Sequence, residues 1–170
     1  MLCITGHGIY TGFFWVCIMT KIAIIGAGFA GLSIAHLLKN AAEITLFDKA
    51  RGVGGRMATR RSDHYVFDHG AQYFTARTEA FQNFIRPLMK ENIITPWHAS
   101  YAKIRDSNII ESRSWKHDLP RYIGINGMNK VAKYLAKSFS VHLRTTITSL
   151  DHHGQWQLMD ANAQRHGPFD

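Results

Sequence analysis

Residues 21–40, KIAIIGAGFAGLSIAHLLKN, carry the strongest indication of the fold class. The first five residues form a continuous apolar run, which predicts a strand buried on both faces of a parallel sheet. The glycine-rich GAGFAG follows, and apolar residues then recur at helical spacing, with Asn40 suited to a left-handed helix end. Residues 43–48, EITLFD, predict a second buried strand. Strand, helix and strand within about thirty residues indicate a right-handed βαβ unit.

The three glycines of the motif occupy the positions that a dinucleotide site requires. Gly26 permits the tight turn, Gly28 allows the backbone to approach a pyrophosphate, and Gly31 lets the helix pack close to the strand. The first helical turn then offers free N–H groups and the positive end of its dipole to the phosphates. Asp48 follows about 20 residues further on, where a carboxylate can bind the ribose hydroxyls of an adenosine. The less favoured interpretation is a tight turn without a ligand.

A second glycine motif lies shortly after this carboxylate. Residues 54–56 are Gly-Gly-Arg, and their combination with Asp48 favours FAD as the ligand. Lys49 and Arg51 could instead accept the 2′-phosphate of NADP. An NAD(P)-dependent dehydrogenase is therefore the alternative on the same fold.

The rest of the chain predicts an α/β protein with an insertion. MATRR and HYVFD are typical of strands, residues 77–92 of an amphipathic helix, and residues 93–120 of short strands. A helix after Gly127 and strands in VHLRTTITSL and WQLMD predict a return to the first sheet. We expect a Rossmann-like FAD/NAD(P)-binding domain with a parallel sheet, plus the start of an inserted α+β substrate region. The expected divisions are an upstream extension (1–18), a dinucleotide-binding part (19–76), a partial substrate or cap region (77–120) and a truncated return to the FAD-binding domain (121–170).

Three longer motifs resemble a known family. GAGFAGLSIAHLLKNAAEITLFDKARGVGGR, residues 26–56, is similar to the N-terminal signature of FAD-dependent oxidoreductases of the amine-oxidase superfamily. MATRRSDHYVFDHGAQYFTAR, residues 57–77, and RYIGINGMNKVAKYLA, residues 121–136, resemble the renalase-like branch. The resemblance runs from about Lys21 to the end of the chain, with the motifs in the family's order.

This resemblance implies an FAD site in three parts and assigns no catalytic side chain. Around the pyrophosphate and ribityl chain it places Gly26, Gly28, Phe29, Ala30, Gly31, Gly54, Gly55, Arg56 and Met57. At the adenosine it places Asp48, with Lys49 beside it, and the backbone of Ile147. Near the isoalloxazine ring it places residues 68–73, in which Gln72 can hydrogen-bond the polar edge of the ring.

Members of this family are markedly longer, and their C-terminal half completes the substrate region. We therefore expect the N-terminal part of such a protein, with an unpaired apolar sheet edge that favours aggregation or a second chain. Because Met19 lies just before the first strand, residues 1–18 are expected to be an upstream extension. A short hydrophobic anchor is the less favoured alternative.

The composition, 46% hydrophobic and 19% charged over 170 residues, is typical of one globular domain. The formal net charge of +8 is scattered apart from a cluster near Arg56, so we expect an anionic ligand and no nucleic acid. The two cysteines give no disulfide framework, and the ten histidines lack the cysteine-partnered spacing of a metal site. The apolar run at residues 9–19 is too short to span a bilayer. We expect a cytoplasmic protein that binds neither metal nor membrane.

The leading hypothesis is an FAD-dependent oxidoreductase that transfers a hydride from a carbon–hydrogen bond next to nitrogen onto the flavin. The resemblance implies a small-molecule substrate, either an amine or a reduced nicotinamide-like compound. Two alternatives stay open. One is an NAD(P)-dependent Rossmann oxidoreductase. The other is a non-catalytic nucleotide-binding remnant, or half of a split enzyme that a second chain completes.

Overall fold

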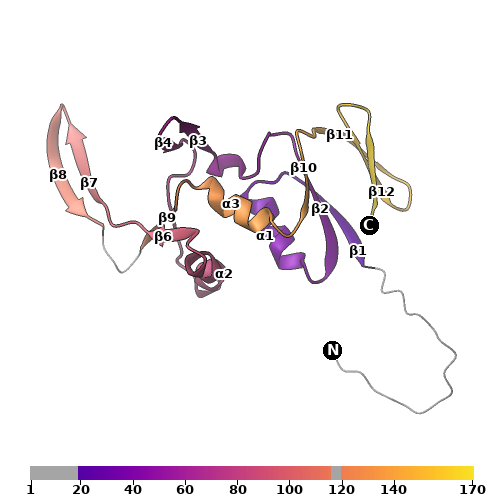
Figure 1. The fold of residues 1–170 in the computed structure, drawn as a ribbon, viewed down its shortest axis with the longest axis horizontal. Helices are drawn as coiled ribbons and strands as arrows, with labels where there is room; N and C mark the ends of the chain where they lie inside the picture. Colours follow the sequence, from indigo (N-terminus) through magenta and orange to yellow (C-terminus); the bar gives the residue numbers. More distant parts are fainter. Residues whose placement is uncertain (1–18, 116–119) are drawn as a thin grey trace, which may run out of the picture.

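A parallel sheet forms the centre of the molecule. The computed structural model describes residues 19–115 and 120–170, so the extension predicted at residues 1–18 lies outside the described part. The sheet has the order β1–β2–β10, with β1 at Thr20–Ile25, β2 at Ala42–Asp48 and β10 at Ser140–Leu143. Both pairings are parallel, with Ile22 opposite Ile44 and Val141 opposite Leu46. The predicted α/β fold with a βαβ unit is confirmed (Figure 1).

Two helices cover one face of this sheet, α1 at Phe29–Leu38 and α3 at Asn129–Ala136. Ile44 and Leu46 of β2 point into the same core as Leu32 and Ala35 of α1, both of which have no exposed surface. Because side chains alternate along a strand, Phe47 enters a second core on the opposite face. Helix α1 ends with Lys39 in the right-handed helical conformation, so the left-handed end predicted at Asn40 is wrong.

The opposite face carries an antiparallel meander, in the order β11–β12–β13. Its strands are β11 at Ile147–His152, β12 at Trp156–Asp160 and β13 at Arg165–Phe169. The sequence predicted that VHLRTTITSL and WQLMD return to the first sheet. This is confirmed for β10 and wrong for β11 and β12. They form a sheet of their own because Leu158 and Phe169 bury their side chains against Phe47.

A buried carboxylate fixes the turn between the last two strands of the meander. Asp160 is 4% exposed and accepts hydrogen bonds from the backbone N–H groups of Asn162 and Gln164. Its other oxygen lies 3.0 Å from Nε2 of His166. The hydrogen bond from His166, followed by that from Gln164, lowers the pKa of Asp160 below its ordinary value.

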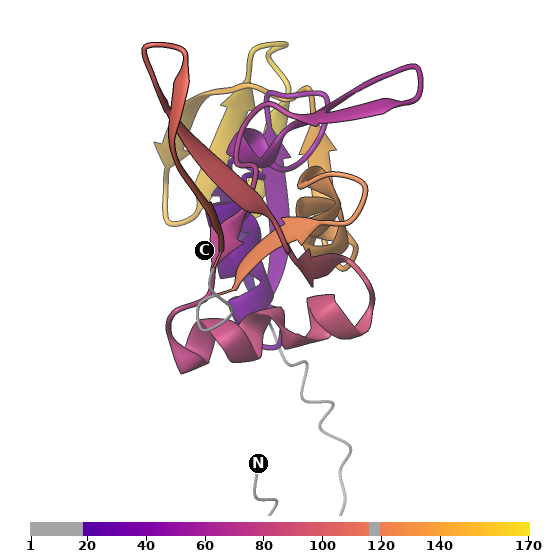
Figure 2. The same cartoon turned by 90° about the vertical axis from the view of Figure 1, so that its left-hand side faces the viewer.

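The inserted region forms a second sheet and two hairpins. Its elements are η1 at Gly55–Met57, β3 at Thr59–Ser62, β4 at Tyr65–Asp68, β5 at Phe74–Thr75, α2 at Glu79–Lys90, β6 at Ile94–Pro96, β7 at Ser100–Arg105, β8 at Asn108–Ser114 and β9 at Arg121–Gly124. Strands β5, β9 and β6 form one sheet, whereas β3–β4 and β7–β8 form separate hairpins. Figures 1 and 2 show both hairpins projecting from the layered body. Strand β9 pairs with β5 and β6, so the inserted sheet extends beyond the division expected after residue 120.

Helix α2 begins at a capped end and runs along the base of the inserted sheet. The side chain of Thr78 accepts a hydrogen bond from the N–H of Phe81, and Ile85 and Leu88 are buried. The predicted helix is confirmed, and it continues through Pro87 to Lys90. Within the described residues, none of the helices combines the length and the apolar character that crossing a membrane requires.

Strand β1 lies at an edge of the parallel sheet and is less buried than its sequence predicts. Ile25 is 54% exposed, so the expectation of a strand covered on both faces is wrong for its final residue. At the open edge, the N–H of Lys21 donates to the Asp170 carboxylate, and the N–H of Asp170 donates to the Lys21 carbonyl. The N–H of Gly26 points to the opposite side of the strand and donates to the carbonyl of Phe47 in β2. Because alternate residues bond to opposite sides, the N–H groups of Ala23 and Ile25 point towards the open edge.

The close packing of α1 on β1 yields a first prediction. A methyl group on Gly31 would overlap the carbonyl oxygen of Gly26, a backbone atom that cannot move without displacing the turn. We expect Gly31→Ala to lower the free energy of unfolding by about 1–3 kcal/mol, measured by urea denaturation. Gly52→Ala is the matched control, because a methyl group there meets no atom within 4 Å and the change should stay within about 0.5 kcal/mol. Equal losses of unfolding free energy in the two variants would contradict the close packing of α1 on β1 at Gly31.

The register of β1 yields a second prediction. In the chain expressed alone, amides of Ile22 and Ile24 bond to β2, whereas those of Ala23 and Ile25 face the open edge. We expect the edge amides to exchange with deuterium at least about tenfold faster, measured residue by residue by NMR. Similar protection of all four amides would show that another strand covers the edge.

Candidate dinucleotide site

The loop between β1 and α1 leaves room and hydrogen-bond donors at its surface. Gly26 has φ of 108°, in the region that favours glycine, and turns the chain sharply after β1. Gly28 is the N-cap of α1, and it has no side chain that could accept hydrogen bonds from the first helical turn. A Cβ on either glycine would meet no atom within 4 Å. The loop therefore presents unbonded N–H groups to an open space, which suits a pyrophosphate.

The second glycine motif packs directly against the first. The N–H of Gly54 donates to the Ala27 carbonyl over 2.9 Å, and Gly54 forms a parallel bridge with Gly28. A Cβ on Gly55 would lie 3.4 Å from the Cα of Gly28. Gly54 and Gly55 both have positive φ, 118° and 51°. Two motifs that are separate in the sequence thus form one glycine-lined surface.

Asp48 ties the end of β2 to the glycine loop. One carboxylate oxygen accepts the N–H of Ala27 over 2.7 Å, and the other accepts the N–H of Ala50 over 2.8 Å. Each carboxylate oxygen has a second lone pair, so the half-buried group can still accept hydrogen bonds from ribose hydroxyls. Asp48 therefore holds the loop in place and keeps acceptor sites free on both carboxylate oxygens.

A pocket of about 240 Å³ opens on the Asp48 side of the loop. It is lined by Ile25, Gly26, Phe47, Asp48, Lys49, Thr145, Thr146 and Ile147. The structure thus brings together four residues assigned to the cofactor from segments far apart in the sequence. Thr145 and Thr146 of this lining were not predicted from the sequence, where their only signal is a polar pair between two strands. The N–H of Thr145 donates to the Asp48 carbonyl over 2.9 Å.

A second pocket, of about 360 Å³, opens on the other side of the loop. It is lined by Phe29, Arg56, Met57, Ala71, Phe74, Phe81 and Met128. Because Gly26 lines the first pocket and Phe29 lines the second, the glycine loop lies between the two. An elongated ligand could therefore cross the loop from an adenosine end to an apolar end.

The side chains at the apolar end have different environments. The ring of Phe29 packs edge-on against Phe81 and Phe84, and Met57 is 7% exposed, so both side chains belong to the core. Arg56 and Ala30 are exposed. The two core residues can contribute backbone or apolar surface to a ligand, and Arg56 can contribute charge.

The segment assigned to the flavin ring lies beside Arg56 but is divided between two pockets. The N–H of Ala71 donates to the Arg56 carbonyl over 2.8 Å, and a side chain on Gly70 would overlap the same carbonyl. Ala71 lines the second pocket. Gln72 lines a third, of about 420 Å³, which also contains Trp97 and Ile123. The structure therefore does not place Gln72 in the same pocket as Arg56.

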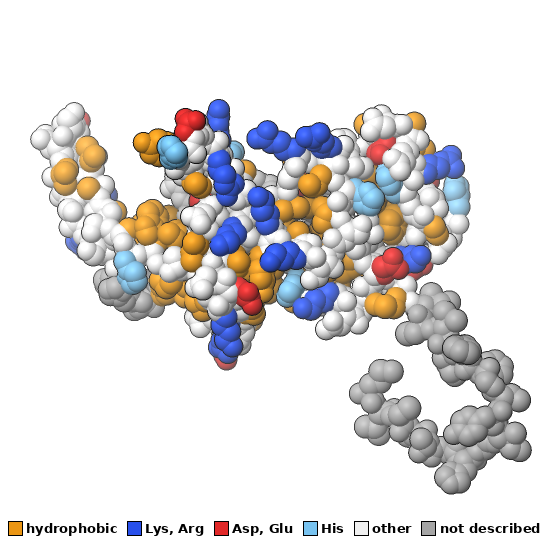
Figure 3. All heavy atoms as spheres, in the orientation of Figure 1, with side chains coloured by type: hydrophobic (Ala, Val, Ile, Leu, Met, Phe, Trp, Pro, Cys, Tyr) orange, Lys and Arg blue, Asp and Glu red, His pale blue; other side chains and the backbone are white. Residues whose placement is uncertain are grey.

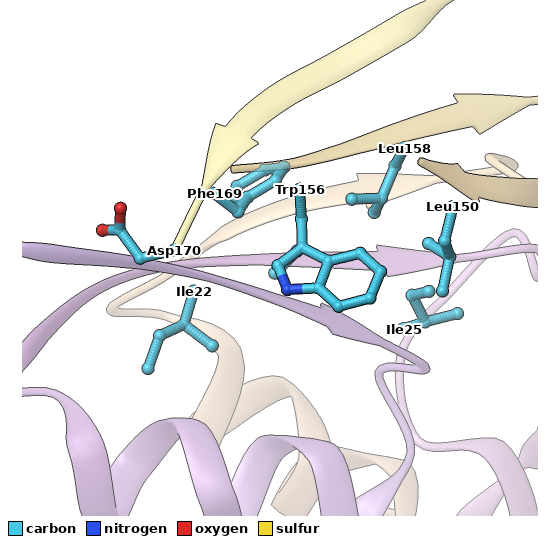
Figure 4. A pocket seen from close by; sticks show the side chains of 8 residues that line it. Ile22, Ile25, Leu150, Trp156, Leu158, Phe169 and Asp170 are labelled. Carbon is cyan, nitrogen blue, oxygen red and sulfur yellow. The ribbon is translucent and has the colours of Figure 1, made fainter. Parts of the chain in front are cut away.

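A separate apolar groove of about 230 Å³ follows the open edge of β1. Figure 4 shows the Trp156 indole beside Leu150, Leu158 and Ile25, with Asp170 at the far end. Of the residues that line the groove, only Ile25 also lines the pocket on the Asp48 side of the loop. It is a surface between the sheet and the meander, apart from the glycine loop.

Fold and loop geometry define a dinucleotide-binding Rossmann-like domain, and comparison with known proteins agrees. Residues 24–88 match the family described as NAD(P)-binding Rossmann-like domain. The chain is 30% identical over 146 residues to renalase of Mus musculus, which covers 78% of this chain and 40% of renalase. A 51-residue stretch is 45% identical to 4,4'-diapophytoene desaturase of Staphylococcus aureus, covering 29% of this chain and 10% of the desaturase.

Solved structures share the fold at low sequence identity. Tetracycline destructase Tet(51) matches with a TM-score of 0.63 and 15% identity, over 88% of this chain and 36% of that one. A redesigned putrescine oxidase matches with a TM-score of 0.62 and 13% identity, over 86% of this chain and 56% of the oxidase. The chain is thus similar to renalase over most of its own length, and it shares a Rossmann-like fold with these solved structures. It spans about two-fifths of the length of mouse renalase.

The two bonds of Asp48 generate a third prediction. Asp48→Asn places an amide N–H₂ opposite one of the two backbone N–H groups and removes the charge at the ribose position. Loss of one charge-assisted hydrogen bond, about 1.5–3 kcal/mol, should weaken FAD binding at least about tenfold, measured by quenching of flavin fluorescence. Glu43→Gln makes the same chemical change at an exposed position of the same strand and should have no effect. A similar loss of FAD affinity in both variants would show that Asp48 is not part of the binding site.

Proposed function

We propose that this chain binds FAD across the glycine loop and forms the cofactor-binding part of an oxidoreductase. The observation that carries the proposal is the single surface formed by both glycine motifs, with a pocket at each end and unbonded N–H groups between them. NAD(P) needs the same loop, but the apolar second pocket favours a cofactor with a large aromatic ring system at that end. The basic side chains that gather over and around α3 on the face in Figure 3 suit an anionic cofactor.

Different residues of the chain would bind different parts of the cofactor. The first turn of α1 would bind the pyrophosphate, Asp48 the ribose, and the backbone of Ile147 the adenine. Phe29 and Met57 would exclude water from the apolar end, where Arg56 adds a positive charge. FAD, when bound, accepts a hydride from a carbon–hydrogen bond next to nitrogen. We propose an amine or a reduced nicotinamide-like compound as the substrate.

Gly28→Ser tests the cofactor separately from the fold. A side chain at Gly28 has space, its φ of −74° suits any residue, and serine is a good N-cap, so stability should not fall. The hydroxyl would occupy the phosphate position and accept the N–H groups that the phosphates need. We expect the thermal midpoint to stay constant or rise while FAD affinity falls at least about tenfold.

The measurement is flavin absorbance of the protein after incubation with FAD and gel filtration. The unmodified chain should retain flavin, and a hydride donor such as NADH should bleach the flavin band in the absence of oxygen. A colourless protein that binds NADPH, with Lys49→Gln abolishing that binding, would instead establish the NAD(P) alternative. Retention of flavin by Gly28→Ser at the original affinity would overturn the proposed position of the pyrophosphate.

The open edge of β1 favours a second candidate function, half of a split enzyme. The pair of bonds between Lys21 and Asp170 begins a ladder that a strand could continue past Ala23 and Ile25, with apolar side chains in the groove of Figure 4. The occupant would be an apolar strand of a second chain. Amide exchange in protein isolated from its natural source tests this candidate. Protection of Ala23 and Ile25 there, but not in the chain expressed alone, supports it, whereas a homodimer of this chain would contradict it.

A further inference from the structure

Four side chains of the inserted region form an aromatic–arginine cluster, which consists of Tyr73, Trp97, Trp115 and Arg121. The rings of Trp97 and Trp115 meet edge to face with centroids 4.7 Å apart, and Tyr73 lies 5.2 Å from Trp115. The guanidinium carbon of Arg121 lies 4.2 Å from the centre of the Trp115 ring and 5.6 Å from that of Tyr73. The cluster thus holds a cation between two aromatic rings.

The strands of the inserted sheet bring these residues to one place. Arg121 begins β9, Tyr73 directly precedes β5, and Trp97 directly follows β6. The N–H of Trp97 donates to the Arg121 carbonyl over 2.7 Å, which extends the pairing of β6 with β9. The N–H of Trp115 donates to the Ala99 carbonyl over 3.0 Å and extends the pairing of β7 with β8 by one residue. Backbone hydrogen bonds therefore position the cluster, which suits a preformed site.

The positive charge of Arg121 is not balanced within the described part of the chain. Its Nε atom is buried and has no hydrogen-bond partner, and no carboxylate of the described residues forms an ion pair with it. Asp68, which lines the same pocket as Trp97, accepts hydrogen bonds at Oδ1 from the hydroxyl of Thr59 and the N–H of Met128, and it forms no ion pair with Arg121. A half-buried guanidinium without a counter-charge is costly, so an anionic ligand beside it would stabilise this arrangement.

One member of the cluster, Trp97, borders a cavity that can hold a ring-sized ligand. Trp97 lines the 420 Å³ pocket together with Gln72, the residue assigned to the polar edge of the flavin, and with Asp68. Tyr73 and Trp97 keep 41% and 37% of their surfaces exposed, so ring surface is available for stacking. With one face of the guanidinium against Trp115, its in-plane N–H groups suit the two oxygens of a carboxylate.

We propose that the aromatic–arginine cluster binds a planar ring that carries a carboxylate, and that Arg121 determines this specificity. The ring stacks on the exposed aromatic surface, and the carboxylate accepts hydrogen bonds from the guanidinium. This ligand would be the substrate of the flavin site, and only that step of the inference rests on the proposed function. Binding itself requires no flavin, so the two proposals can fail separately.

The experiment compares two probes of nearly equal shape on the flavin-free chain by isothermal titration calorimetry. Nicotinate carries a carboxylate on a pyridine ring, whereas nicotinamide carries a neutral amide at the same position. We expect nicotinate to bind at least about tenfold more tightly, which corresponds to about 1.4 kcal/mol. Arg121→Gln should remove this preference. Arg121→Lys should keep the sign of the preference but reduce its size, because lysine lacks the planar pair of donors.

Arg105→Gln is the control, since it removes an arginine from the exposed β7–β8 hairpin outside the cluster and should leave both affinities unchanged. Circular dichroism establishes that each variant folds, and Arg121→Lys preserves the test if Arg121→Gln does not fold. Equal affinity for the two probes, absence of nicotinate binding at millimolar concentration, or a preference that survives in Arg121→Gln would each overturn the proposal. In those cases the cluster would serve only to hold Trp115 against the side chains at the ends of the inserted strands.

Discussion

The hydrophobic core and the glycine loop are both shaped by the close approach of helix α1 to strand β1. It occurs at Gly31, where the Gly26 carbonyl occupies the space that any side chain would fill. This approach lets Leu32 and Ala35 reach the core beside β2 with no surface left exposed. It also aims the first turn of the helix at the open space above Gly28. The same contact therefore builds the hydrophobic core and exposes the positive end of the helix dipole at the glycine loop.

Asp48 and the second glycine motif complete this arrangement from two sides. Asp48 hydrogen-bonds Ala27 from the end of β2, and Gly54 hydrogen-bonds the carbonyl of the same residue from the opposite direction. Ala27 itself has no exposed surface. With both of its backbone groups bonded, the loop is held in one conformation before any ligand arrives, which lowers the entropic cost of binding. The site is thus an extension of the backbone hydrogen-bond network of the fold.

The sequence predicted the parts of the structure that local patterns determine. Apolar runs and helical spacing were sufficient for β1, α1, β2 and α3, and the resemblance assigned Asp48 and Ile147 to one end of a ligand, where the structure places them in one pocket. Patterns could not show which sheet each strand joins. The meander separates from the parallel sheet because Phe47 offers Leu158 and Phe169 a partner on the second face, a contact between residues more than a hundred positions apart. The aromatic–arginine cluster was missed for the same reason, since its members come from four segments and share no motif.

If both glycine motifs form one cradle for FAD, amides of both motifs must respond together when the cofactor binds. In a titration of the ¹⁵N-labelled chain with FAD, we expect the largest amide chemical-shift changes at Gly26, Gly28, Gly31, Gly54 and Gly55, all with the same saturation curve. The β7–β8 hairpin should stay unchanged. Shift changes confined to one of the two motifs, or centred on the groove beside β1, would show that the motifs do not bind FAD as one surface.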